Sequence, residues 1–261
     1  MLFVPLALYL ALAIFALLFS GKVIFQPHPA SYKDTDGIFK IVAASGKKIS
    51  AVYLPYPGAK FTLLFSHGNA EDLGDNRYWL NELNHAGFNV LAYDYEGYGT
   101  SEGAPSEKSV YQDEEAAYDY LVQDLHIAPN RVIVLGRSVG SGPATYLAAR
   151  RPVAALVLES PFVSAFRVLT RIPIFPWDKF PNGRNIHQVQ CPVLIIHGTA
   201  DRIVAFWHGK KLYEMANEPK RYLWIDGGGH NDLVMVAGKR YLQALKDFAA
   251  SLAEGSRGQE M

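Results

Sequence analysis

The chain has 261 residues, 49% of them apolar, and its 25 basic side chains are balanced by 25 acidic ones. A chain of this length and composition can bury one substantial core as a single α/β domain. Its formal charge of zero, without a Lys/Arg-rich run, excludes an obvious nucleic-acid surface. Cys191 is the only cysteine, which excludes an intramolecular disulfide and a Cys-x-x-Cys metal or redox site.

The N-terminal segment 1–21 predicts a transmembrane anchor. Residues 2–20 carry no charge. A helix of this length, at about 1.5 Å per residue, is long enough for a hydrocarbon core of about 30 Å. A signal peptide is the alternative, but the segment has no Lys or Arg before the apolar run and no clean small-residue cleavage site near Ser20. We therefore favour an anchor over a signal peptide.

The charges after this segment predict its orientation. Lys22, Lys33 and Lys40 all lie on the C-terminal side. Because basic residues favour the cytoplasmic side of a membrane, the domain that follows this segment is expected in the cytoplasm. Residues 22–35 contain Phe25 and two prolines, and they predict an extended neck at the membrane surface.

The rest of the chain alternates apolar strands with helices, which predicts an α/β fold with a mostly parallel central sheet flanked by helices. The first two strands, 38–42 and 48–54, are joined by a short turn and are expected to form an antiparallel edge. Further strands are expected at 61–66, 89–94, 131–135, 154–158, 193–197 and 222–225, and helices at 76–86, 106–125, after 141, at about 207–216 and at 233–253.

One segment interrupts this alternation between the sixth and seventh strands. Residues 161–190 are rich in Pro, Phe and Arg and predict a short cap over the site, with Phe162, Phe166 and Trp177 as candidate pocket residues. The α/β domain is expected to span residues 36–254, with a tail after it at 255–261.

Residues 136–140 have the pattern Gly-x-Ser-x-Gly between a strand and a small-residue helix. This context is typical of a nucleophile elbow, in which the glycines let strand and helix pack closely around an exposed serine. Ser138 is therefore the candidate nucleophile.

Two residues after later strands can complete a catalytic triad with Ser138. A serine hydroxyl needs a neighbouring imidazole as general base, and His230 follows the last strand in a glycine-rich loop. Asp201, after the preceding strand, is the candidate acid that orients the imidazole. Glu159 remains a reserve candidate for the acid, and Asp226 is expected to shape its own loop.

The loop after the third strand predicts an oxyanion hole. The backbone N–H of Asn69, with that of Ala70 as a further option, can act together with the N–H of Val139. His67 and His197, at strand ends, are expected to fix loops. The glycine-rich loop 94–103 lacks a nucleotide-binding pattern, so we expect it to border the pocket.

Residues 36–253 as a whole resemble the α/β-hydrolase-fold serine hydrolases. Within them, the chain is similar to the membrane-associated group that includes the depalmitoylating protein thioesterases. Five strings carry the resemblance: S-H-G-N-A-E-D-L-G at 66–74, Y-D-Y-E-G-Y-G-T-S-E-G at 93–103, G-R-S-V-G-S-G-P at 136–143, I-I-H-G-T-A-D at 195–201 and G-G-G-H-N-D at 227–232.

The resemblance implies hydrolysis of carboxylic esters or thioesters through an acyl-enzyme, without a metal or cofactor. The eukaryotic thioesterases reach membranes through a palmitoylated, cysteine-rich N-terminus. This chain has an apolar span without cysteine there, so protein depalmitoylation does not carry over directly.

The expected substrates are small-molecule, acyl-lipid or acyl-protein esters with an apolar acyl or aryl group. A peptidase of the same fold and a catalytically silent, membrane-anchored binding protein are the alternatives. A dehalogenase is disfavoured, because it would need an acid at position 138.

Overall fold

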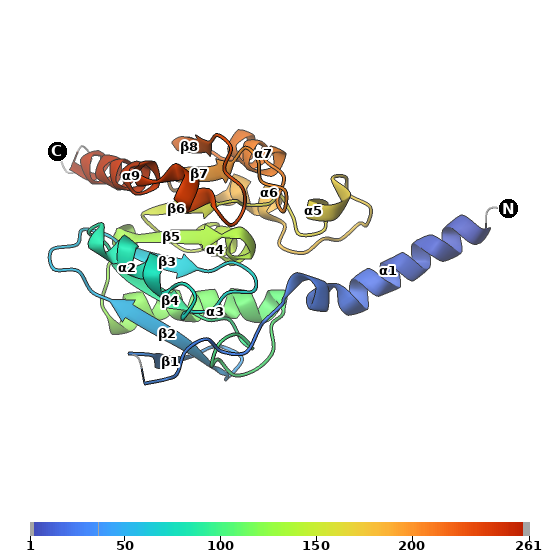
Figure 1. Cartoon of the computed structure of the whole chain (residues 1–261), viewed down its shortest axis with the longest axis horizontal. Coiled ribbons are helices and arrows are strands. Elements are labelled where there is room, and N and C mark those ends of the chain that lie inside the picture. Colours follow the sequence, from blue (N-terminus) through green and yellow to red (C-terminus); the bar gives the residue numbers. More distant parts are fainter. Residues whose placement is uncertain (1–2, 36, 258–261) are drawn as a thin grey trace.

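The apolar runs form one eight-stranded sheet in the computed structural model, which describes residues 3–35 and 37–257 (Figure 1). The strand order is β1-β2-β4-β3-β5-β6-β7-β8, with β1 and β2 antiparallel at one edge and every pair from β4 onward parallel. The predicted fold class and edge hairpin are therefore confirmed. The strands are β1 (Phe39–Val42), β2 (Lys48–Leu54), β3 (Thr62–Ser66), β4 (Asn89–Tyr93), β5 (Val132–Arg137), β6 (Ala155–Glu159), β7 (Val193–Gly198) and β8 (Lys220–Ile225).

Helices cover both faces of the sheet because successive strand side chains point to opposite sides. Leu64 and Val134 join the core under α3, α4 and α7, whereas Leu63 and Ile133 join the core under α2, α8 and α9. The helices are α1 (Phe3–Ile24), α2 (Arg77–His85), α3 (Glu107–Asp119), α4 (Ser141–Ala148), α5 (Arg167–Thr170), α6 (Asn182–Asn185), α7 (Trp207–Met215), α8 (Leu233–Ala237) and α9 (Lys239–Arg257).

The prediction of one continuous helix over 233–253 is wrong. Gly238 adopts a φ of +54° and separates α8 from α9. Glycine enters this left-handed region readily, and a residue there ends a helix. The apolar period of α9 places Tyr241, Leu245 and Phe248 in the core but carries no sign of the break before it.

Helix α1 projects from the domain (Figure 1). Its segment Leu6–Ile24 is long and apolar enough to cross a membrane, a test that a signal sequence near an N-terminus also passes. The helix continues to Ile24, so the first residues expected in the neck are helical.

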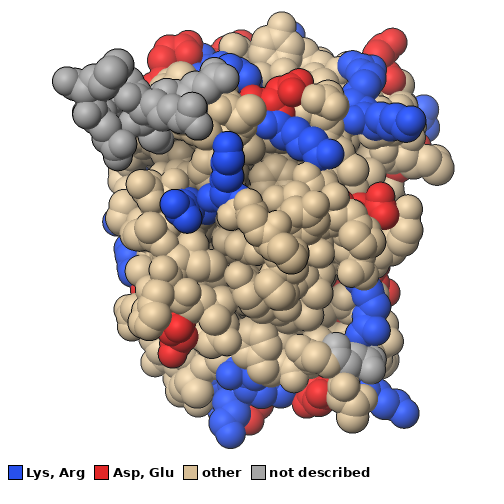
Figure 2. Space-filling model, turned by 90° about the vertical axis from the view of Figure 1, so that its left-hand side faces the viewer, with Lys and Arg blue, Asp and Glu red and all other residues tan. Residues whose placement is uncertain are grey.

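A cavity of about 1090 Å³ lies at the amino ends of the strands, on the face seen in Figure 2. Phe61, Pro192 and Phe248 contribute apolar walls, and Arg131 and Arg221 lie at its border. Ser138 follows the carboxyl end of β5, whereas this cavity lies at the amino ends of the parallel strands. The cavity is therefore remote from the candidate nucleophile.

Two acidic side chains of α3 are buried. Glu114 accepts hydrogen bonds from the Ser66 hydroxyl and from the Tyr93 hydroxyl, the latter at 2.6 Å. Asp113 accepts one from the Glu96 N–H at 2.9 Å. Burial is the main cause that raises the pKa of Asp113 to about 8 and that of Glu114 to about 7.

We expect Asp113→Asn to flatten the pH dependence of stability. An acid with a raised folded pKa stabilises the fold below its unfolded pKa of about 4, and this contribution is lost as pH rises towards about 8. The asparagine keeps an acceptor for Glu96 and does not titrate. Chemical denaturation in detergent between these pH values measures the slope, and Asp247→Asn, an exposed acid on α9, is the control. An unchanged slope in Asp113→Asn would contradict the assignment.

Candidate active site

Ser138 occupies a strained turn between β5 and α4. Its φ is +51°, a region that costs a residue with a side chain about 1–3 kcal/mol. A Cβ at Gly136 would collide with the Gly140 carbonyl, and one at Gly140 would collide with the Ser66 carbonyl. Only glycine therefore allows the close approach that holds Ser138 in this conformation.

The structure brings His230 and Asp201 to this serine. The His230 Nε2 atom lies 2.9 Å from the Ser138 Oγ, and its Nδ1 atom lies 2.7 Å from the Asp201 Oδ2. An ionised Asp201 can only accept hydrogen bonds, so the Nδ1 atom of His230 carries the proton that is shared with it. The Nε2 atom is then free to accept the serine hydroxyl proton.

The loops after β7 and β8 are in contact, and this contact sets the distance between Asp201 and His230. The Ala200 N–H donates to the Gly228 carbonyl at 2.9 Å, and a Cβ at Gly198 would collide with the same carbonyl. His230 and Asp201 therefore lie on two loops joined by backbone contacts.

Asp201 is held as a carboxylate. Its Oδ1 accepts the backbone N–H groups of Ile203 at 2.9 Å and Val204 at 2.8 Å. Burial alone would raise the pKa of Asp201, but hydrogen bonds from His197 and His230, together with the charge of His230, hold it well below its ordinary value. His197 Nε2 lies 3.4 Å from the Asp201 Oδ2 and 2.8 Å from the Val204 carbonyl, so it braces this loop as expected.

The other two carboxylates have different partners. Glu159 accepts a hydrogen bond from Tyr241 at 2.7 Å and pairs with the Arg137 Nε at 3.2 Å. Asp226 accepts one from the Thr199 hydroxyl at 3.1 Å, which fits the loop-shaping role expected for it. Of the three candidates, only Asp201 contacts His230 in the part of the chain that the structure describes.

The predicted oxyanion loop lies against the elbow. Gly140 contacts the Ser66 and His67 carbonyls so closely that no Cβ fits between them. His67 is buried and its Nδ1 bonds the Gly68 carbonyl at 2.7 Å, in keeping with a loop-fixing role. Asn69, whose N–H is a candidate donor, follows directly in this loop.

The three candidate pocket aromatics occupy two environments. Phe162 is buried in the core next to Phe180. Phe166 and Trp177 pack against Phe175 with ring centroids 5.9 Å and 5.2 Å away, in the segment between β6 and β7. Phe175 also contacts Tyr9 of α1 at 5.9 Å, so this aromatic cluster bridges the segment to the N-terminal helix.

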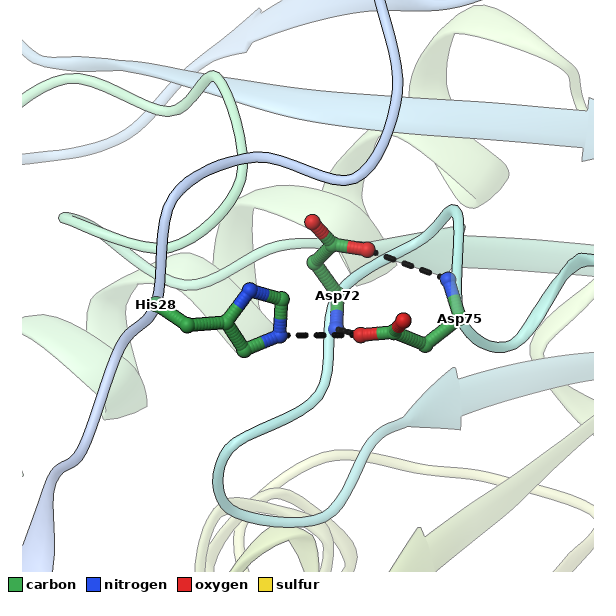
Figure 3. Close-up of side chains that lie close together, drawn as sticks. All are labelled: His28, Asp72 and Asp75. Atoms are coloured by element: carbon green, nitrogen blue, oxygen red, sulfur yellow. Dashed lines mark hydrogen bonds and ion pairs between the residues drawn. The ribbon is translucent and has the colours of Figure 1, made fainter.

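Among the described residues, one group of side chains has possible metal-ligand atoms close together: His28, Asp72 and Asp75 (Figure 3). The oxygens of Asp72 already accept hydrogen bonds from Ser31 and the Gly74 N–H. His28 bonds the Pro29 carbonyl at 2.7 Å and the Asp75 carboxylate at 2.9 Å.

Both partners of the His28 ring are acceptors, and the bond to the Pro29 carbonyl is the main cause that raises the pKa of His28. These contacts fasten the neck to the domain.

Comparisons with known proteins agree with this arrangement. The chain is 41% identical over 222 residues to α/β hydrolase domain-containing protein 17B of Xenopus laevis, a match that covers 84% of this chain and 76% of the relative. The chain belongs to the α/β-hydrolase family. The human protein of the same name is 40% identical over the same length and coverage.

The chain also matches a family model and a solved structure. A family model described as serine aminopeptidase, S33 matches residues 57–177. The solved structure of an esterase from Pyrococcus furiosus superposes with a TM-score of 0.72 at 18% identity, covering 87% of this chain and 98% of the esterase. At that identity the superposition shows a shared fold alone.

Two contacts of the site could not be predicted from the sequence. Asn69 is expected to act through its backbone N–H, but its side chain also bonds Ile24 and Gln26. The Tyr98 hydroxyl donates to Asn69 at 2.7 Å. No local pattern links positions this far apart, so only the folded chain shows these contacts.

Proposed function

We propose that this protein is a serine hydrolase that cleaves carboxylic esters or thioesters through an acyl-enzyme. The single observation that carries the proposal is the hydrogen-bonded chain from the Ser138 Oγ to His230 and Asp201, at 2.9 Å and 2.7 Å. Nucleophile, base and orienting acid in this order form the arrangement that activates a serine.

In the proposed reaction, Ser138 attacks the acyl carbonyl while His230 takes its proton at Nε2. The tetrahedral intermediate collapses, and His230 returns the proton to the leaving alcohol or thiol. Water then attacks the acyl-enzyme with His230 again as the base, which releases the acid and restores Ser138. Asp201 stays ionised and stabilises the imidazolium.

The backbone N–H groups of Asn69 and Val139 are the proposed oxyanion donors. The tight contact of Gly140 with the Ser66 and His67 carbonyls supports this, because it holds the loop of Asn69 beside the turn that carries Val139. Donors fixed before the reaction stabilise developing charge without reorganisation.

The proposed substrates carry an apolar acyl or aryl group. The aromatic cluster of Phe166, Phe175 and Trp177 supports such a preference, as does the buried Phe162 next to Phe180. We further propose that α1 anchors the protein in a membrane with the catalytic domain on the cytoplasmic side, from the apolar length of α1 and the lysines that follow it.

A peptidase is the second candidate, because the matching family model is named for serine aminopeptidases. The same triad can cleave an amide when the leaving amine is protonated. Hydrolysis of aminoacyl p-nitroanilides at rates above those of the esters would favour the peptidase.

We expect Ser138→Ala and His230→Ala each to abolish labelling by a fluorophosphonate probe and to lower kcat by at least about 10³-fold, because nucleophile and base act as one unit. Labelling in a gel and release of p-nitrophenol measure both effects. Undiminished turnover by Ser138→Ala, or a wild-type protein that neither reacts nor turns over, would contradict the proposal and favour a silent binding protein.

Asp201→Asn should lower kcat by about 10²–10⁴-fold, because the amide no longer fixes the imidazole tautomer. Glu159→Gln is the matched control, since Glu159 bonds Arg137 and Tyr241 instead of His230. The kinetics of both variants would be compared at one pH. A near-normal rate in Asp201→Asn with a large loss in Glu159→Gln would move the role of the acid to Glu159.

We expect kcat/KM for p-nitrophenyl esters to rise with acyl length from acetate to octanoate, because burial of each added CH₂ contributes about 0.8 kcal/mol. An acyl-thioester run beside them measures the preference for sulfur or oxygen leaving groups. Phe166→Ala should flatten the rise, whereas a flat series for the wild type would argue against an apolar acyl site.

A further inference from the structure

We propose that the end of helix α1 and the first neck residues, Ile24–Gln26, position the oxyanion hole through the side chain of Asn69. The inference rests on the proposed function, because it presumes that the Asn69 N–H stabilises the oxyanion. It goes beyond that function by making the anchoring segment part of the catalytic apparatus. We call the contacts of Ile24–Gln26 with Asn69 and Tyr98 the junction.

Both polar ends of the Asn69 amide bind the backbone of this segment. The Nδ2 atom donates to the Ile24 carbonyl at 2.7 Å, and the Oδ1 atom accepts the Gln26 N–H at 3.0 Å. These two bonds lie on either side of Phe25 and fix the plane of the amide. The pairing needs an amide, because the side chain donates and accepts at once.

Tyr98 completes the junction. Its hydroxyl donates to the Asn69 Oδ1 at 2.7 Å and lies 3.1 Å from the Gln26 nitrogen. Tyr98 is buried and packs against His67, with ring centroids 5.4 Å apart. The junction is thus bound to the same loop that precedes Asn69.

The segment also holds the other side of the site. Phe25 is buried and meets Phe180 edge-on, with centroids 5.9 Å apart. The Phe180 ring lies so close to Gly142 of α4 that a Cβ there would collide with it. Ile24–Gln26 therefore binds the loop of Asn69 through hydrogen bonds. The same segment also packs, through Phe180, against the helix that follows the Ser138 turn.

The oxyanion loop needs such support because it belongs to no strand or helix. Ala70 has a φ of +54°. Gly68 is held by a bond from its N–H to Glu71 at 3.2 Å and by the His67 Nδ1, 2.7 Å from its carbonyl. The Tyr95 hydroxyl holds the His67 carbonyl at 2.7 Å. The junction holds Asn69 itself, which carries the expected donor, and a donor must be fixed in advance to be effective.

The neck supplies a control that is independent of the junction. His28 and Asp75 bond each other at 2.9 Å (Figure 3). Further along the same neck, Ser31 bonds Asp72. These contacts fasten the neck to the domain without touching Asn69. Breaking one of them loosens the neck and leaves the junction intact.

The test compares three variants of the full-length protein in detergent. Asn69→Ala removes both bonds of the amide and keeps its backbone N–H. Gln26→Pro removes the N–H that donates to Asn69 and Tyr98, together with the Gln26 side chain, whose amide donates to the Val23 carbonyl at 3.4 Å. The position precedes Pro27 in the extended neck. His28→Ala is the control. Turnover of p-nitrophenyl butyrate and inhibition by an aliphatic trifluoromethyl ketone, which forms a tetrahedral oxyanion adduct on the serine, are measured for each.

We expect Asn69→Ala to lower kcat by about 10–100-fold, less than the loss of a whole oxyanion donor. The inhibition constant of the ketone should rise in parallel, while KM stays within about twofold. Gln26→Pro should move both quantities in the same direction by a smaller factor, and His28→Ala should match the wild type. A merely structural contact would not couple kcat to affinity for the adduct.

Wild-type kcat and ketone inhibition in both Asn69→Ala and Gln26→Pro would overturn the inference, as would an equal loss in His28→Ala. If Asn69→Ala does not fold, Gln26→Pro decides alone. Ser138→Ala separates the two proposals. If it keeps full turnover, the proposed function falls. If it is inactive while the junction variants behave as wild type, only the junction falls.

Discussion

The close approach of strand β5, helix α4 and the loop after β3 at Ser138 is the constraint on which the site depends. Gly136 and Gly140 leave no room for a Cβ, and the serine between them takes a positive φ. Such a conformation persists only where the surroundings hold it. The parallel pairing of β3 with β5 supplies that support, because it aligns Ser66 with Gly136 and brings the next loop onto the turn.

A second constraint links the edge of the sheet to this turn. The loops after β7 and β8 carry the acid and the histidine, and parallel pairing sets Gly198 opposite Ile225 at the point where both strands end. The contact of Gly198 with the Gly228 carbonyl then draws the two loops together. The distances from His230 to Asp201 and Ser138 thus follow from strand register and glycine packing.

Much of the fold could be predicted from the sequence, because continuous apolar strands and amphipathic helices leave a local period. The order of elements and the antiparallel edge follow from that period and from short turns. The break at Gly238 was not predicted, because the apolar positions Leu233, Ala237, Tyr241 and Leu245 keep one helical period across it. Glycine disfavours a helix interior and often follows a helix end, but this local preference is weaker than that pattern. The contact of Tyr9 with Phe175 was equally hidden, because it joins distant segments.

The sequence by itself determined the chemical types at the site: a serine between glycines, a histidine after the last strand, and several acids at strand ends. The sequence favoured Asp201 as the acid and kept Glu159 in reserve. The tertiary structure distinguishes them, because Asp201 contacts His230 whereas Glu159 contacts Arg137 and Tyr241. It also decided that the Asn69 side chain binds the end of α1. The physical reason is that local sequence sets backbone preference and burial, whereas distances between segments separated by 29 to 92 residues arise only when the whole sheet packs.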